Sequence, residues 1–166
     1  PNPVAPAPYA DAVTDHAIVH GRNLEMDRLV VHYMQPHAPD LPAALERGHA
    51  TETEVSPFRA LIDGEASEEE VWELYLDNVR YVLDSVDNLL KNLDADKVVI
   101  TVDHGELFGE WFMYGHAVGF PHPKLKQVPW VEATATDTKT LDPDPELPNG
   151  ADASVDDHLA QLGYTS

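Results

Sequence analysis

One long amphipathic segment constrains the fold of this chain more than any other feature. Ser67-Glu-Glu-Glu70 is a capping box, in which the Ser67 hydroxyl accepts from the third backbone N–H and Glu70 reaches back to the cap. The acidic residues also lie at the positive end of the helix dipole. Apolar residues then recur at spacings of three and four. They are Val71, Leu74, Tyr75, Val79, Val82, Val86, Leu89, Leu90 and Leu93. The pattern predicts one helix from Glu68 to about Leu93.

Two apolar segments flank this helix and have the composition of buried strands. Residues 28–34 and 97–102 are rich in β-branched residues, and the first of them also holds aromatic ones. A strand, a long excursion, a helix and a second strand are typical of a right-handed crossover in a parallel sheet. We therefore expect an α/β sandwich with a mainly parallel sheet flanked by helices. A shorter strand over 127–133 is expected near an edge, because Pro129 cannot donate to a ladder.

The rest of the chain fits around a single domain. At 166 residues the length suggests one domain covering 1–166. Residues 1–8 form a Pro-rich start with four prolines, which excludes a helix there. A short helix is predicted within 9–23. Residues 136–153 form an acidic, Pro-rich loop, and a last short helix is predicted over 155–162.

The charge of the chain excludes several classes of partner. Thirty acidic and ten basic residues give a net charge of −20. Such a field repels phosphate backbones and anionic lipid, so we expect neither nucleic-acid nor membrane binding. No apolar run approaches the roughly 20 residues that span a bilayer, and the sequence shows no signal segment, so a cytoplasmic location is predicted. The chain holds no Cys, which excludes disulfides and a thiol nucleophile within it. The acidic excess resembles that of proteins from salt-loving archaea, with an ordinary acidic bacterial protein as the alternative.

Chemically capable residues follow the two predicted main strands. Two prolines force a loop around His37 directly after the first strand. Asp103 and His104 follow the second, and Gly105 gives the backbone the freedom to turn both side chains toward one ion. One oxygen and one nitrogen ligand suit Zn²⁺ or Mn²⁺, whereas Ca²⁺ prefers more oxygens. The alternative is an Asp that caps a turn and a His that binds backbone.

Two further histidines lie in loops. His116 follows Tyr114-Gly115 and could be a metal ligand, an anion contact or simply a loop residue. His122 lies between two prolines, with Lys124 and Lys126 close behind, so this segment could meet an anionic substrate. A solvated turn is the alternative. No Gly-rich phosphate loop and no nucleophile elbow is present.

These motifs together resemble a known family. Leu-Val-Val-His-Tyr-Met-Gln-Pro-His-Ala-Pro over 29–39 is similar to a strand and Pro-His-x-Pro loop of sulfatases. Val-Val-Ile-Thr-Val-Asp-His-Gly-Glu over 98–106 is similar to their Asp-His-Gly-Glu metal motif. Leu-Phe-Gly-Glu over 107–110, Gly115-His116, Val-Pro-Trp-Val over 128–131 and the tail over 159–164 follow in the same order. The resemblance is to the sulfatase side of the alkaline-phosphatase superfamily, and it implies that superfamily's sandwich fold, here as a partial domain.

The resemblance also implies roles for individual residues. Asp103 and His104 would bind a divalent metal ion (Ca²⁺, Mn²⁺ or Zn²⁺), and His37 and His116 would contact the substrate anion or its leaving group. The substrate would be a small sulfate or phosphate ester, cleaved by a metal-activated nucleophile. The chain departs from the family at the nucleophile motif, since Val55-Ser-Pro-Phe-Arg59 has Val at the nucleophile position and follows the first strand instead of preceding it. We therefore expect the C-terminal portion of a larger enzyme, inactive alone. A non-catalytic metal-binding or interaction unit is the alternative.

Overall fold

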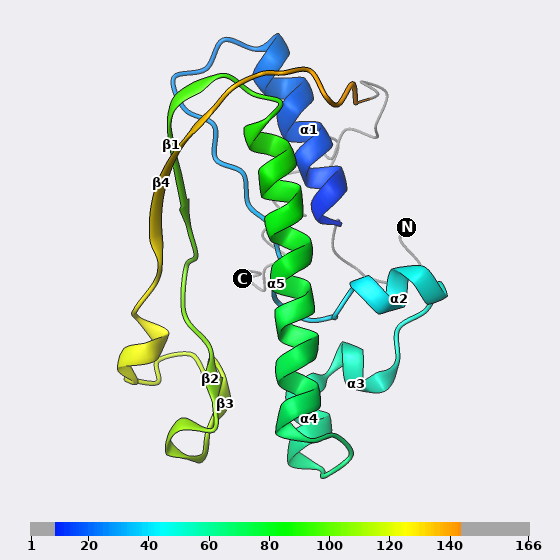
Figure 1. The fold of residues 1–166 in the computed structure, drawn as a ribbon. Coiled ribbons are helices and arrows are strands. Elements are labelled where there is room, and N and C mark those ends of the chain that lie inside the picture. The colour runs from blue at the N-terminus through cyan, green and yellow to red at the C-terminus, as the bar shows by residue number, and fades with distance from the viewer. Residues whose placement is uncertain (1–8, 144–166) are drawn as a thin grey trace, which may run out of the picture.

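The computed structural model describes residues 9–143, and a single long helix forms its centre (Figure 1). This helix, α5, runs over Glu68–Leu90. Its capping box is formed as predicted, because Ser67 Oγ accepts from the Glu70 N–H at 3.2 Å and Glu70 Oε2 accepts from the Ser67 N–H at 2.7 Å. The predicted helix is therefore confirmed, with its C-terminal end three residues earlier than expected.

Helix α1 (Ala10–Asn23) packs along one half of α5 (Figure 1). It buries Ala10, Ala17 and Ile18. Its buried Thr14 hydroxyl donates to the Ser85 carbonyl of α5 at 3.3 Å. The short helix predicted within 9–23 is thus present.

All strands of the described residues pair antiparallel. Strand β1 (Ala95–Thr101) pairs with β4 (Trp130–Ala135), with Val98 opposite Ala133 and Thr101 opposite Trp130. Strands β2 (Leu107–Phe108) and β3 (Tyr114–Gly115) form a second two-stranded sheet. The prediction of a mainly parallel sheet in an alkaline-phosphatase-like sandwich is therefore wrong for the part of the chain that the structure describes. The two strands predicted over 97–102 and 127–133 are present, each displaced by about two residues.

The predicted first strand explains the error. Residues 28–34 are in no helix or strand and pair with no other strand, and Val30 is 88% exposed. In Figure 1 this segment is part of the light-blue trace beside the β1–β4 ribbon. Its β-branched residues favour extended backbone but do not specify a ladder partner, since β-propensity mainly reflects the surroundings in which a strand packs. The inferred crossover therefore joins no parallel pair here.

Three short helices connect the extended segment to α5. They are α2 (Pro42–Arg47), α3 (Glu52–Val55) and α4 (Pro57–Ile62). Two 3-10 turns, Glu110–Phe112 and Pro123–Leu125, lie after β2 and before β4. The chain from 9 to 143 therefore consists of helices on one side of α5 and thin antiparallel ribbons on the other (Figure 1).

Asn78 of α5 holds the loop that carries His37. Its Oδ1 accepts from the Leu41 N–H at 3.1 Å, and its Nδ2 lies 3.2 to 3.3 Å from the carbonyl oxygens of Pro36, His37 and Pro39. Asn78 is fully buried. One amide side chain thus supplies hydrogen bonds that a buried loop could not find within itself.

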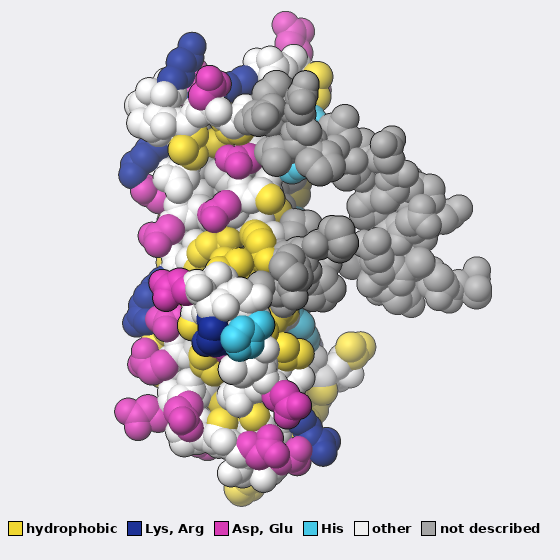
Figure 2. Space-filling view, turned by 90° about the vertical axis from the view of Figure 1, so that its right-hand side faces the viewer, with side chains coloured by type: hydrophobic (Ala, Val, Ile, Leu, Met, Phe, Trp, Pro, Cys, Tyr) yellow, Lys and Arg dark blue, Asp and Glu magenta, His cyan; other side chains and the backbone are white. Residues whose placement is uncertain are grey.

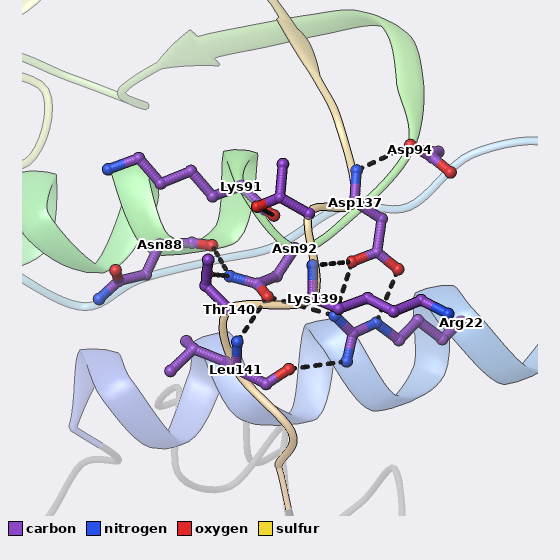
Figure 3. A network of polar contacts seen from close by, with 10 residues as sticks. Arg22, Asn88, Lys91, Asn92, Asp94, Asp137, Lys139, Thr140 and Leu141 are labelled. Carbon is purple, nitrogen blue, oxygen red and sulfur yellow. Dashed lines mark hydrogen bonds and ion pairs between the residues drawn. The ribbon is translucent and has the colours of Figure 1, made fainter.

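A polar network joins the C-terminal ends of α1 and α5 to the chain after β4 (Figure 3). Arg22 binds Asp137 with two hydrogen bonds, at 3.0 Å from Nε and 2.7 Å from Nη2. Asn92 Oδ1 accepts from the Leu141 N–H at 2.8 Å and from Arg22 at 3.2 Å. The Arg22 guanidinium lowers the pKa of Asp137. The network fixes residues 137–141 as an ordered loop, which agrees with the loop predicted to begin at 136.

Acidic side chains spread over the face shown in Figure 2, with few Lys and Arg among them. Within residues 9–143, no helix combines the length and apolar character needed to cross a bilayer. The predicted Pro-rich start over 1–8, the remainder of the loop from 144 and the helix over 155–162 lie outside the described residues.

Candidate functional site

His37 lies in the loop that Asn78 holds. Its backbone N–H donates to the Met34 carbonyl at 3.0 Å, and its ring Nδ1 lies 2.7 Å from the Ala38 carbonyl oxygen. A carbonyl oxygen only accepts, so this contact places the ring proton on Nδ1. The Nε2 atom of His37 keeps its lone pair for a proton or a ligand.

Asp103 and His104 follow the end of β1 after one intervening residue, Val102. His104 Nδ1 lies 3.0 Å from the Gly105 carbonyl oxygen, which likewise leaves Nε2 with its lone pair. That Nε2 is 3.8 Å from Asp103 Oδ1. Two ligands that each lie about 2.1 Å from one ion are at most about 4.2 Å apart, so the pair fits a shared cation. A hydrogen bond to the other ring nitrogen is also the usual support for a metal-binding imidazole.

Gly105 is required for a reason that the sequence does not reveal. A Cβ at this position would lie 2.0 Å from the Lys124 carbonyl oxygen. The Gly105 N–H also donates to the Leu125 carbonyl at 3.1 Å. Because Gly105 has no side chain, the turn at Pro123–Leu125 can pack closely against the end of β1. This close packing fixes the backbone between His104 and Glu106.

His116 follows β3 and donates to the carboxylate of Glu106, whose oxygens both lie 3.0 Å from Nδ1. Leu107 is opposite Gly115 in the β2–β3 ladder, so residues 106 and 116 come next on the two strands. Sequence reasoning included Glu106 in a motif but gave it no role. The register of the β2–β3 hairpin would have identified Glu106 as the partner of His116. Strands of only two residues, however, leave too weak a sequence pattern to be predicted.

Three of the four predicted site residues, His37, His104 and His116, lie with their imidazole rings close together. The His104 and His116 ring centroids are 4.2 Å apart, and those of His37 and His116 are 5.6 Å apart. Asp103 joins them through its contact with His104. Segments that are more than sixty residues apart in sequence therefore meet. Each of the three imidazoles makes a hydrogen bond through Nδ1, and within residues 9–143 none of them makes one through Nε2.

The metal-binding capacity of this cluster is incomplete. Among residues 9–143, no group of three or more His, Asp or Glu side chains is arranged to hold one ion. Asp103 and His104 supply two ligands, whereas even a tetrahedral ion takes about four. Further ligands must come from another segment, from a substrate or from water. The pair suits Mn²⁺ or Zn²⁺, and Ca²⁺ only with several added oxygens.

A cavity of about 180 Å³ lies beside the histidines. His37, Glu106 and His116 line it, and Phe58 and Tyr75 supply aromatic walls. The Val55-to-Arg59 segment also lines this cavity. The site thus has space for an organic group next to the imidazoles.

Asp40 is a buried acid in the lining of the same cavity. It is 4% exposed, and its Oδ2 has no hydrogen-bond partner among the described residues. Burial, with smaller contributions from the carboxylates of Glu54 and Asp77, raises the pKa of Asp40 to about 7. Sequence reasoning missed this residue because its only local signal is a position after a Pro-rich loop.

The segment around His122 has a structural role. His122 Nδ1 accepts from the Lys124 N–H at 3.2 Å and so caps the turn at Pro123–Leu125. The Lys124 ammonium pairs with Glu110 and, with the backbone N–H groups of Phe108 and Glu110, lowers the pKa of that carboxyl to about 2. Lys124 is therefore engaged. His122 is buried, so this segment is a capped turn packed against the fold and not a solvated one.

Comparisons with protein-family models, with curated proteins and with solved structures find no match to this chain.

Proposed function

We propose that this chain carries part of the active site of a metal-dependent hydrolase of sulfate esters. One observation supports the proposal above all. His37, His104 and His116, chosen from sequence motifs in distant segments, form one cluster with ring centroids 4.2 and 5.6 Å apart. A cytoplasmic location is part of the same proposal.

Each residue has a role that its geometry allows. Asp103 and His104 hold the cation, which when bound stabilises negative charge on the ester oxygens. His37 and His116 line the cavity, and Nδ1 of each is engaged, so Nε2 is the ring nitrogen left to act on a substrate. In the protonated state, each can donate a hydrogen bond to the anion or a proton to the leaving alcohol. Glu106 orients the His116 ring through its Nδ1–H.

The same groups suit a phosphate ester, because both esters present tetrahedral anionic oxygens. A phosphoester hydrolase or transferase is therefore the neighbouring candidate, and the two are separated by assay. The nucleophile is not assigned to a residue of this chain, since Val55 occupies the position that resembles the family's nucleophile.

The test uses the full-length gene product and this chain alone. Both are assayed against an aryl sulfate and an aryl phosphate with Mn²⁺, Zn²⁺ or Ca²⁺, and the bound metal is measured. We expect metal-dependent sulfate-ester hydrolysis by the full-length protein and none by the chain alone. Asp103→Ala should lose both metal and activity, because it removes one of two assigned ligands. His116→Ala should keep the metal and lower the turnover by about 10²- to 10⁴-fold.

The matched control is His20→Ala, which removes an exposed histidine of α1. It should change neither the metal content nor the rate. Full metal content and full rate in Asp103→Ala would contradict the assigned site. Preference for the phosphate ester would favour a phosphoester hydrolase or transferase. Hydrolysis of neither ester by the full-length protein would overturn the proposal and favour a non-catalytic unit.

A further inference from the structure

We propose that the cavity beside His37 and His116 binds a small organic cation, an ammonium group carried on a compact apolar body. Its assignment as the alcohol part of the substrate rests on the proposed function. The binding of the cation does not, because it depends on Asp40 and the aromatic walls alone.

Asp40 supplies the charge that such a ligand would meet. The side chain is 4% exposed, and its Oδ2 is unpartnered among residues 9–143. The backbone N–H of Asp40 donates to the Glu54 carbonyl at 2.9 Å. This backbone hydrogen bond holds Asp40 in place without using its carboxylate. A buried carboxylate is costly, and the opposite charge of a cation in the adjoining cavity would offset that cost.

The basic side chains near the cavity are already engaged. Arg59 lines the cavity itself and binds Asp63 at 2.5 Å, and Arg47 binds Glu54 at 2.5 Å. Neither contact involves Asp40. Asp40 lines the cavity, Glu106 lines it as well but is paired with His116, and the whole chain has a net charge of −20. The surroundings therefore favour a positive group over a neutral or negative one.

The walls suit an ammonium group as well as an apolar body. Phe58 and Tyr75 line the cavity, and their centroids lie 5.2 and 5.1 Å from the ring of Phe108 in edge-to-face contacts. Trp72 contacts both Tyr75 and Phe108 behind them. This packing fixes the rings, and the faces of aromatic rings attract cations.

The size of the cavity limits the ligand. A cavity of about 150 Å³ accommodates one benzene molecule. The 180 Å³ available here therefore takes one ring, or an aliphatic group of that size, with one ammonium. With the ester group at His37 and His116, the substrate would be an ester of a small amino alcohol, and its positive and negative ends would meet Asp40 and the imidazoles respectively.

The test measures binding of benzylammonium and of benzyl alcohol to the full chain by titration calorimetry, without metal and without an ester. A buffer near pH 8 keeps Asp40 largely ionised, and about 0.5 M KCl shortens the Debye length to about 4 Å, which suppresses attraction to the general charge. We expect benzylammonium to bind at least tenfold more tightly than benzyl alcohol, since both fill the cavity and only one carries the charge.

Asp40→Asn keeps the shape of the side chain and removes its charge. It should weaken benzylammonium at least tenfold and change benzyl alcohol less than twofold. Asp84→Asn makes the same chemical change at an exposed position of α5 and should alter neither. Equal binding of the two probes by the unmodified chain, no binding of benzylammonium, or undiminished binding by Asp40→Asn would each overturn the proposal. The probe comparison needs no variant, so it stands even where Asp40→Asn fails to fold.

These outcomes are separable from the proposed function. Loss of the cation site in a protein that still hydrolyses sulfate esters would overturn this inference alone. Selective binding of benzylammonium in a protein without metal-dependent hydrolysis would overturn the enzyme assignment alone.

Discussion

The imidazole of His116 donates from Nδ1 to the carboxylate of Glu106, and both carboxylate oxygens lie 3.0 Å from that nitrogen. The two residues are next in register to the Leu107–Gly115 pair of the β2–β3 hairpin, so the backbone places them opposite one another. The carboxylate fixes both the ring orientation and the position of its proton. The catalytic nitrogen in our proposal, Nε2, is thereby directed away from Glu106.

Glu106→Gln should impair turnover without removing the metal. The amide oxygen can still accept from Nδ1, but the negative charge that favours this proton position is lost. On the proposed function, we expect kcat of the full-length protein to fall about 10- to 100-fold, as is usual for partners that orient a functional histidine, while KM changes less than about twofold. Metal analysis and steady-state kinetics on the same preparation check this. A large rise in KM with unchanged kcat would assign Glu106 to substrate binding instead.

Asp40→Asn should stabilise the chain at alkaline pH. The pKa of Asp40 is raised from 3.8 to about 7 in the fold, because burial disfavours the charged form. The folded state therefore holds a proton that the unfolded state releases, and stability falls as pH rises from about 4 through about 7. The variant removes this loss, so we expect its gain to reach at most about 4 kcal/mol near pH 8 and to be small near pH 4.

Urea unfolding of both proteins at the two pH values measures this difference. Asp84→Asn is the control, since its exposed carboxylate should give the same stability change at both pH values. A gain at Asp40→Asn that does not depend on pH would show that the carboxyl of Asp40 is not the titrating group.

The sequence predicted the local elements of the fold better than their pairing. Helix α5 was readable because Ser67 and Glu70 define its start and its apolar residues keep one period over more than five turns. The pairing of β1 with β4 was not, because apolar composition makes residues 28–34 and 97–102 equally suitable as strands. Which strands pair depends on contacts between distant segments, and no local pattern records them.

The candidate site also contains residues that the sequence predicted and one that only the structure reveals. His37, Asp103, His104 and His116 were chosen from motifs, and the fold brings the three imidazoles into one cluster. Asp40 could not be chosen in this way. Its importance arises from burial beside α5 and from the absence of a partner for its Oδ2 among the described residues, which only the three-dimensional arrangement reveals.

Asn92→Ala should destabilise the described domain by about 2–3 kcal/mol. Asn92 is fully buried, and its amide binds Arg22, Leu141, the Asn88 carbonyl and Thr140 at 2.8 to 3.2 Å (Figure 3). Its removal leaves the Leu141 N–H without an acceptor, and an unpaired buried group costs about 1–3 kcal/mol. Asn88→Ala is the matched control, because this neighbour contributes only its backbone carbonyl. Similar urea midpoints for the two variants would show that the network of Figure 3 contributes little to stability.

Potassium chloride should stabilise the chain, mainly at low concentrations. The net charge is −20, and acidic side chains are spread over the face seen in Figure 2, so their mutual repulsion opposes folding in dilute buffer. The Debye length falls from about 10 Å at 0.1 M to about 3 Å at 1 M salt, which removes most of this repulsion. We expect Tm to rise steeply up to about 1 M KCl and then to level off, because screening is then nearly complete. Thermal melts across KCl concentrations, with sucrose as a non-ionic control, test this. A Tm that is flat or falls with KCl would show that repulsion between the acidic side chains does not limit the stability of the fold, and a rise matched by sucrose would point to general solute exclusion instead.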